Sequence, residues 1–168
     1  MNKNILHVPS ISYFNNEWNA LQTFLKRRGN PPFHIDGDLN LTDTSIKDLE
    51  NLTSVGGYLD LRRTPIKDLG NLISVGGYLI LYRTPIESLG NLTSVEGYLD
   101  LYKTPIKDLG KLTSVGGDLD LESASIESLG NLTSVGGSLI LLNTPISRTM
   151  TEDEIRSQVN VEGNIYFK

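Results

Sequence analysis

A block of 20 residues repeats along the chain and constrains its fold more than any other feature. The clearest copy spans residues 56–75, and a looser copy spans residues 36–55. Later copies with the same apolar skeleton begin at Gly76, Glu96, Gly116 and Gly136. A fixed period of this length predicts a solenoid, in which each repeat forms one coil and neighbouring coils share a core. A solenoid offers a long regular surface, so the pattern favours binding over catalysis.

Each repeat predicts one short parallel strand. Leu59 and Leu61 are two residues apart and therefore face the same side of a strand, which we expect to be the core. The preceding Gly56-Gly57 pair is expected to make the turn into the strand, where φ is free to be positive. Thr64-Pro65 is expected to end it, because proline fixes φ and has no N–H to donate.

The rest of the repeat predicts a 3₁₀ or extended back for the coil. Its apolar residues recur every three positions, at Ile66, Leu69, Leu72 and Val75. That spacing suits 3₁₀ or polyproline-like turns rather than an α-helix. Threonines recur at one position, as in Thr64, and serines at another, as in Ser74. We expect both rows to be structural, with small hydroxyls inside the solenoid satisfying backbone groups.

The repeat, Leu-x-Leu-x-x-Thr-Pro-Ile-x-x-Leu-x-x-Leu-x-x-Val, resembles the leucine-rich repeat family over residues 36–148. Thr stands where that family usually has Asn. The variant Ser-Val-Gly-Gly-Tyr-Leu resembles the short leucine-rich repeats of tailed bacteriophages and some bacteria. The resemblance implies an α/β-type solenoid whose strand face binds proteins.

Three regions are expected along the chain. Residues 1–35 predict an N-terminal cap with a helix at about 15–28, because Phe14, Trp18, Leu21 and Leu25 would share one helical face. Residues 36–148 form the predicted leucine-rich repeat solenoid. Residues 149–168 predict a short C-terminal helix and a terminal strand.

The C-terminal region has clear local signals. Thr151 and Glu154 match a capping box, which predicts a helix over residues 152–159. Residues 164–167 then imitate the start of another repeat. A strand at that edge would present unpaired backbone groups. We therefore expect a homodimer through this edge strand, the alternative being a helix that folds over the end and keeps the protein monomeric.

The positions beside the paired leucines are expected to face outward and to form a binding face. Tyrosine and arginine are the residues that most often anchor protein interfaces. An acidic zone follows the aromatic one along the chain, and stacked tyrosines that merely stiffen the sheet are the structural alternative. The candidate protein-binding residues are Tyr58, Tyr78, Tyr82, Tyr98, Tyr102, Arg62, Arg63, Arg83, Lys103, Asp100, Asp118, Asp120 and Glu122.

We expect no catalytic residue, metal site or cofactor. Asp100 and Asp120 should lie on adjacent strands at a separation near that of retaining glycosidases, but an open sheet would leave both solvated. Calcium is disfavoured because residues on rigid strands seldom surround an ion. His7 and His34 lie outside the repeats with no ligand partner at close spacing, which favours packing or surface roles.

Composition limits the classes of partner and the cellular location that we expect. A formal net charge of −5 gives no electrostatic support for binding nucleic acid. The chain has no cysteine, no membrane-length apolar run and no signal-peptide pattern, so we expect a cytoplasmic protein, in the host cytoplasm if it is phage-encoded.

These features predict a non-enzymatic protein–protein interaction module with a host or viral partner. One form of that hypothesis is a phage-encoded inhibitor of a bacterial host enzyme or defence protein. The alternative is a glycan-binding or structural component of a virion adhesin, because exposed tyrosines also stack on sugar rings.

Overall fold

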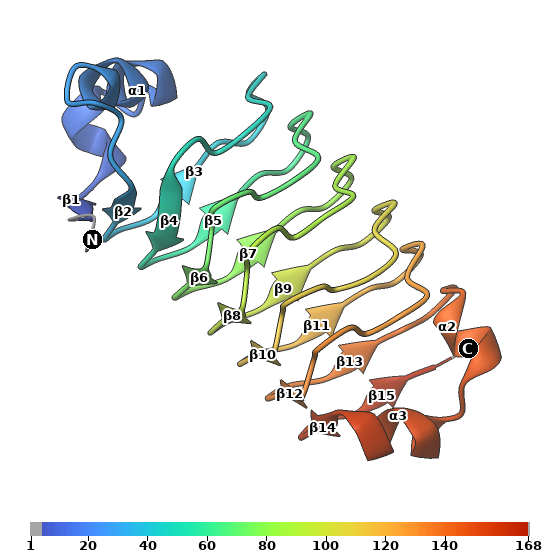
Figure 1. The fold of residues 1–168 in the computed structure, drawn as a ribbon. Helices are drawn as coiled ribbons and strands as arrows, with labels where there is room; N and C mark the ends of the chain where they lie inside the picture. Colours follow the sequence, from blue (N-terminus) through green and yellow to red (C-terminus); the bar gives the residue numbers. More distant parts are fainter. Residues whose placement is uncertain (1–4, 168) are drawn as a thin grey trace.

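The chain forms a solenoid of stacked coils of about 20 residues, seen in a computed structural model that describes residues 5–167 (Figure 1). Successive coils pair through parallel strands, as the repeat predicts. The first and last coils depart from the regular spacing and carry the helices (Figure 1).

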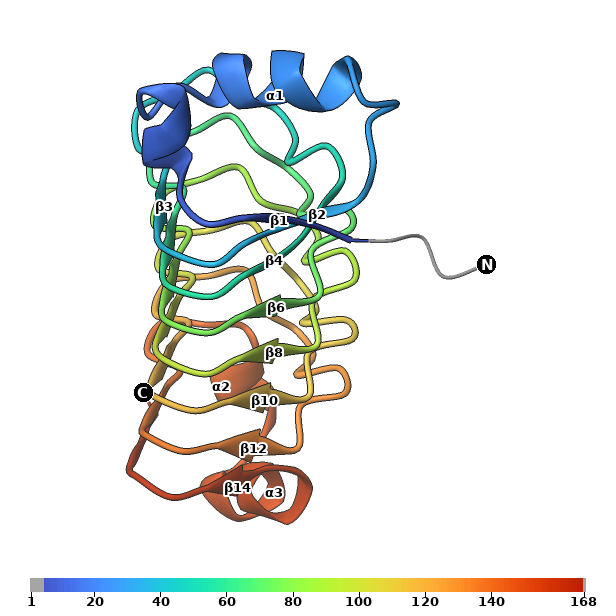
Figure 2. The same ribbon diagram turned by 90° about the vertical axis from the view of Figure 1, so that its left-hand side faces the viewer.

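From β2 onward, each coil contributes two short strands, one to each of two parallel sheets, whereas the N-terminal segment before it contributes only β1 (Figure 2). Sheet A has the order β1 (Leu6–Val8), β2 (Phe33–Ile35), β4 (Leu52–Val55), β6 (Ser74–Val75), β8 (Ser94–Val95), β10 (Ser114–Val115), β12 (Ser134–Val135), β14 (Asn160–Val161). Sheet B has the order β3 (Leu39–Asn40), β5 (Leu59–Asp60), β7 (Leu79–Ile80), β9 (Leu99–Asp100), β11 (Leu119–Asp120), β13 (Leu139–Ile140), β15 (Ile165–Tyr166). The prediction of one strand per repeat was therefore wrong.

The core lies between the two sheets and is continuous along the stack. Leu59, Leu61, Ile66, Leu69 and Val75 of one coil are all fully buried, and their counterparts in the other regular coils are buried as well. Equivalent leucines pair across coils, as Leu59 does with Leu79. The inward orientation predicted for the paired leucines is confirmed.

The back of the regular coils contains no 3₁₀ helix within the described residues and consists of turns, isolated bridges and irregular segments. Backbone groups there bond to the neighbouring coil: Glu87 N–H donates to Lys67 O at 2.8 Å, and Thr93 N–H donates to Ile73 O at 2.8 Å. Such bonds between coils replace the local bonds that a 3₁₀ helix needs. The 3₁₀ helix that the structure does contain, η1 (Ile11–Phe14), lies in the N-terminal segment.

The second glycine of the Gly-Gly pair is explained by close approach and not by positive φ, while the first position is Glu96 in one coil. Within the described chain, the glycines with positive φ are Gly29, Gly70, Gly90, Gly110 and Gly130. A Cβ built on Gly77 would instead lie 2.8 Å from the carbonyl carbon of Gly57 in the preceding coil. Glycine therefore lets two backbones pass at this corner, and the predicted reason for the pair was wrong.

Side-chain ladders satisfy the turns. The Thr64 hydroxyl donates to Leu61 O at 2.8 Å, and its counterparts repeat this bond, which confirms the structural role predicted for the threonines. An asparagine ladder is also present at another position, where Asn91 Nδ2 donates to Gly70 O at 3.1 Å. The serines of sheet A are only half-buried beside the buried valines, so they face outward rather than inward as predicted.

The N-terminal helix is α1 (Trp18–Lys26), shorter than the predicted 15–28. Its buried residues Trp18, Leu21 and Leu25 join the core of the solenoid, and the helix lies at the N-terminal end of the stack (Figure 2). Its role as a cap stays a prediction, as do the boundaries drawn at residues 35 and 148.

The C-terminal prediction is confirmed in its main features. Helix α3 (Glu152–Gln158) begins with the capping box formed by Thr151 and Glu154. Strand β15 then pairs with β13, so the last coil ends in the predicted strand. The sequence did not predict α2 (Ile146–Thr149), a single turn that precedes α3. None of the described helices has the length and apolar character needed to cross a bilayer.

Candidate functional site

The predicted binding residues lie along the outer face of sheet B. The buried leucines of each strand point inward, so the residues that alternate with them point outward. The parallel register then aligns these positions from coil to coil, as Asp100 with Asp120. We call the part of this face formed by Tyr58, Tyr78, Tyr82, Tyr98 and Tyr102 the tyrosine face.

The tyrosines of this face stack in pairs along the solenoid. The rings of Tyr58 and Tyr78 have centroids 4.9 Å apart and planes inclined by 2°. The rings of Tyr82 and Tyr102 have centroids 5.5 Å apart and planes inclined by 13°. The tyrosines therefore stack on each other, as the structural alternative predicts. A role in binding a partner would be additional to this stacking.

Tyr98 shares its column with Tyr58 and Tyr78 but has a polar partner. Its hydroxyl donates to Asp120 Oδ2 at 3.4 Å. Burial, followed by the neighbouring carboxylates of Asp100 and Asp120, raises the pKa of Tyr98 well above its ordinary value. Tyr98 is therefore a neutral donor that joins the aromatic zone to the acidic zone.

Two of the four predicted basic residues are held in ion pairs. Arg62 binds Asp60, a nearly fully buried carboxylate, through Nε and Nη2. Arg63 binds Asp43 of the preceding coil, and this hydrogen bond and charge lower the pKa of Asp43. Each arginine is therefore held in place by a bidentate ion pair between its guanidinium group and a carboxylate.

The other two basic residues lie over tyrosine rings. The Arg83 guanidinium carbon is 5.1 Å from the ring centroid of Tyr82, and the Lys103 ammonium nitrogen is 4.9 Å from that of Tyr102. These are cation–π distances. Lys103 and Arg83 also have positive φ values of 54° and 53°, which places each at the tight turn after its strand.

The aspartates of the acidic zone also stabilise turns. Asp100 Oδ1 accepts the Tyr102 N–H at 2.9 Å, and Asp120 Oδ1 accepts the Glu122 N–H at 2.8 Å. Asp118 Oδ1 accepts the Ser138 N–H of the next coil at 2.6 Å. In each carboxylate, one oxygen therefore accepts a backbone N–H of a turn. The acidic zone is partly explained by this stabilisation of the turns.

Asp100 is more buried than the sequence suggested. Burial raises its pKa, the Tyr102 N–H lowers it, and the Asp120 carboxylate raises it again. Asp100 and Asp120 are both only partly exposed, so neither carboxylate of this pair is freely solvated, contrary to the expectation.

Sequence reasoning missed two features. Tyr166 pairs in register with Ile140 and is 47% exposed, so it adds a sixth tyrosine to the outer face of sheet B. His7 and His34 are not isolated, because they lie opposite each other on β1 and β2 and both contact Asp36. The available signal was the repeated apolar-His-apolar triplet, Leu6-His7-Val8 and Phe33-His34-Ile35.

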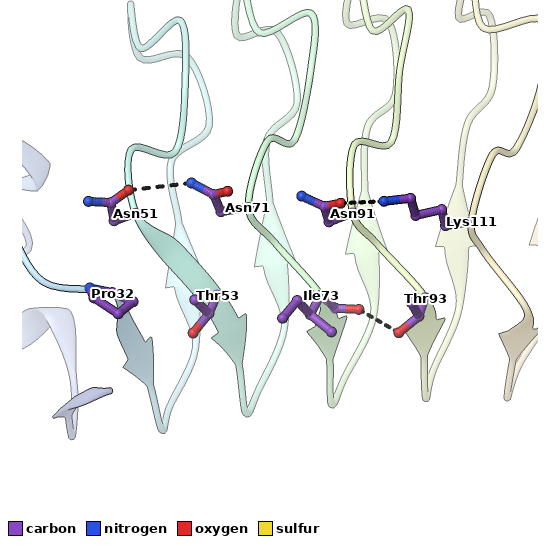
Figure 3. Close-up of a pocket in the computed structure, with 8 residues that line it drawn as sticks. All are labelled: Pro32, Asn51, Thr53, Asn71, Ile73, Asn91, Thr93 and Lys111. Atoms are coloured by element: carbon purple, nitrogen blue, oxygen red, sulfur yellow. Dashed lines mark hydrogen bonds between the residues drawn. The ribbon is translucent and has the colours of Figure 1, made fainter. Parts of the chain in front are cut away.

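A separate groove of about 490 Å³ runs across the coils beside the strands of sheet A (Figure 3). Its walls contact each other: Asn71 Nδ2 donates to Asn51 Oδ1 at 3.3 Å, and Lys111 Nζ donates to Asn91 Oδ1 at 2.7 Å. Ile73 is its exposed apolar residue, at a position where other coils have threonine. The groove does not include any residue of the tyrosine face.

Comparisons with known proteins add no relative to this description. The sequence matches no protein-family model, and neither the curated proteins nor the solved structures include a match. The assignment of the chain as a parallel-stranded solenoid therefore rests on its own repeat and structure.

Proposed function

We propose that this solenoid is a non-enzymatic module that binds a protein partner across the tyrosine face. The observation that carries the proposal is the concentration of tyrosines and cations on one outer face, with Arg83 and Lys103 over the rings of Tyr82 and Tyr102. Tyrosine and arginine supply large contact areas, and aromatic rings lose little conformational entropy on binding. Stacking before binding reduces that loss further.

The shape of the surface supports the same proposal. A hollow of about 440 Å³ lies at the N-terminal end of the tyrosine face, between Asp38, Asn40 and Tyr58 on one side and Ser10 and Asn16 on the other. A protruding side chain of a partner fits such a hollow, while the acidic residues at the other end complement a basic patch.

The glycan alternative fits the ring arrangement less well. Sugar rings stack on open aromatic faces, but Tyr58 and Tyr78 cover one face of each other, as do Tyr82 and Tyr102. Tyr78 is 42% exposed, and a tyrosine combines an apolar ring with a polar hydroxyl, which suits the mixed contacts of a protein interface. A role in a virion adhesin thus has less support than protein binding.

The finer proposal, a leucine-rich repeat protein acting as a phage-encoded inhibitor of a bacterial enzyme or defence protein in the host cytoplasm, rests on the sequence resemblance alone. Binding across the tyrosine face does not require it.

The test is differential capture from a bacterial lysate followed by a measured affinity. Proteins retained by the wild-type chain but lost by the Tyr82→Ala/Tyr102→Ala variant identify the partner. We expect that double variant to weaken binding of the purified partner by at least about 2 kcal/mol, or about 30-fold in Kd.

The matched control is Tyr13→Ala, which removes a 75% exposed tyrosine of the N-terminal segment, outside the tyrosine face. It should leave the affinity unchanged. Equal affinity for wild-type and double variant would exclude the tyrosine face. Binding of a polysaccharide with the same tyrosine dependence would favour the glycan alternative.

Dimerisation through the C-terminal edge stays a prediction. Strands β14 and β15 are the last in sheets A and B, and Tyr166 on β15 is exposed. Light scattering at micromolar concentration distinguishes dimer from monomer, and Tyr166→Asp should dissociate a dimer formed through this edge.

A further inference from the structure

We infer that His7, His34 and Asp36 form a binding site for a divalent transition-metal ion of the zinc type, on the outer face of sheet A at its N-terminal end. The site is separate from the tyrosine face, which lies on sheet B, and it does not depend on the function proposed for that face. His7 Nδ1 lies 3.2 Å from Asp36 Oδ1, and His34 Nε2 lies 3.0 Å from the same oxygen.

The fold brings the three residues together through strand register. Strands β1 and β2 pair in parallel with His7 directly opposite His34. Val8 and the two neighbours of His34 are buried, so both imidazoles point out of the solenoid. Asp36 follows His34 by two residues and lies on the same side, held by a 2.9 Å bond from its N–H to Val8 O.

The donor set and its spacing suit Zn²⁺. Two imidazoles and one carboxylate are borderline ligands that zinc accepts in sites with three protein ligands. Bond lengths of about 2.0–2.2 Å place the ligands of a tetrahedral zinc ion roughly 3.4 Å apart. The ligand atoms of these three residues all lie within 4.8 Å of one another, so a small outward shift of each would admit the ion.

A further contact orients one ligand. Ser54 Oγ lies 2.6 Å from His34 Nδ1. A proton on Nδ1 donates to this hydroxyl and leaves the Nε2 lone pair directed at Asp36 and the ion. Metal-binding histidines commonly have such a partner on the second ring nitrogen. This contact gives Ser54 a role in orienting His34, whereas the fold itself gives the serines of this row none.

A hydrolase triad is a less complete explanation of the same contacts. Ser54, His34 and Asp36 follow the order hydroxyl, imidazole, carboxylate. The acid of a triad is buried, whereas the Asp36 side chain is 48% exposed and is shared with a second histidine. Metal binding accounts for His7, and a triad does not.

The test uses Co²⁺ as a spectroscopic probe and Zn²⁺ as a competitor, on protein without a polyhistidine tag. The chain contains only these two histidines, so imidazole NMR signals report on the site directly. We expect one Co²⁺ per chain with visible d–d absorption, displacement by Zn²⁺, and shifts of both imidazoles. Zn²⁺ should also raise the Tm with increasing concentration.

Variants separate the proposed site from adventitious binding. His7→Gln and Asp36→Asn should abolish the saturable Co²⁺ signal, and Ser54→Ala should weaken it about 10- to 100-fold. His7 is 70% exposed, so its replacement leaves folding intact. The matched control is Glu96→Gln, which removes an exposed carboxylate from the position equivalent to Asp36 in a later coil, beside Ser94 instead of a histidine. Absence of stoichiometric binding, or equal binding by His7→Gln, would overturn the assignment.

Discussion

The outer faces of the two sheets differ sharply although they enclose the same core. On sheet A, the outward position is serine in each regular coil, from Ser54 to Ser134. On sheet B, the equivalent outward position changes from Asp60 to Ile80, then to Asp100, Asp120 and Ile140. The backbone repeat is the same for both faces, so the repeat alone does not demand the variation on sheet B.

This contrast separates structural residues from candidate functional residues within one chain. A position that is nearly constant between coils is explained by packing or turn chemistry, as Thr64, which Ala124 replaces in one coil, is by its bond to Leu61 O. The departures are informative: the tyrosines and acids of sheet B, and His34 at the head of the serine row of sheet A. Both proposed sites lie at such departures.

The largest expected effect tests the shared core. Leu79 is fully buried in sheet B, and Leu79→Ala should lower the free energy of unfolding by about 2–5 kcal/mol by leaving a cavity. Ser74→Ala, on the outer face of sheet A, should change it by no more than about 0.5 kcal/mol. Chemical denaturation measures both. A loss below about 1 kcal/mol for Leu79→Ala would contradict its inward orientation.

The next effect tests the corner that joins the two faces. Gly77→Ala places a Cβ 2.8 Å from the Gly57 carbonyl carbon, and we expect a loss of about 1–3 kcal/mol because the two coils must separate. Gly110→Asn is the control, since nothing lies within 4 Å of its Cβ and asparagine tolerates its φ of +60°. Its loss should be below about 1 kcal/mol, and the reverse order would refute the close-approach explanation.

A smaller effect tests whether the tyrosines of sheet B act as pairs. In a double-mutant cycle for folding stability, Tyr82→Ala and Tyr102→Ala should couple by about 0.5–1.5 kcal/mol through their stacked rings. Tyr58 and Tyr102 belong to different stacks, so the same cycle for that pair should be additive. Zero coupling for Tyr82 and Tyr102 would show that stacking does not stabilise the sheet.

The smallest effect concerns pH and has opposite signs at two aspartates. Burial raises the pKa of Asp100, so its contribution to stability is complete below its unfolded pKa and is lost as pH rises through the folded value. Arg63 lowers the pKa of Asp43, so its contribution is present above the unfolded pKa and is lost as pH falls.

Unfolding measured between about pH 3 and pH 6 distinguishes these two carboxylates. Asp100→Asn should remove a loss of stability on raising the pH, and Asn40 in the same column already makes the equivalent bond to a turn N–H. Asp43→Asn should remove a loss on lowering the pH. Shifts of the same sign in both variants would contradict the different environments of the two side chains.

The sequence was most informative where a signal is local or periodic. Leu59 and Leu61 repeat with fixed phase, and Thr151 and Glu154 form a local capping box, so the sheet B strands and α3 were predictable. The Ser-Val strands of sheet A were not, because the buried residues there, such as Leu72 and Val75, are three positions apart and show no alternation of period two. For the back, a spacing of three left 3₁₀ and extended backbone as open alternatives, and the sequence alone did not decide between them.

The outward location of the candidate site residues could be read from alternation with the leucines, but their partners could not. The stacking of Tyr58 on Tyr78 and the burial of Asp100 depend on rotamers that the pattern leaves open. The meeting of His7 with His34 depends on pairing between β1 and β2, which are joined by α1 and lie outside the repeat. Pairing between strands that are far apart along the chain produces no periodic pattern in the sequence.

Because the coils stack at a constant spacing, the number of repeats sets the length of this molecule. Each coil bonds its backbone only to its neighbours, and strands in a sheet are about 4.8 Å apart. Duplication or loss of a whole repeat would therefore lengthen or shorten the distance between the hollow near Tyr58 and the acids near Asp118 in fixed steps of about that size. Recombination between near-identical repeats would then change the spacing along the proposed binding surface while leaving the core of each coil unchanged.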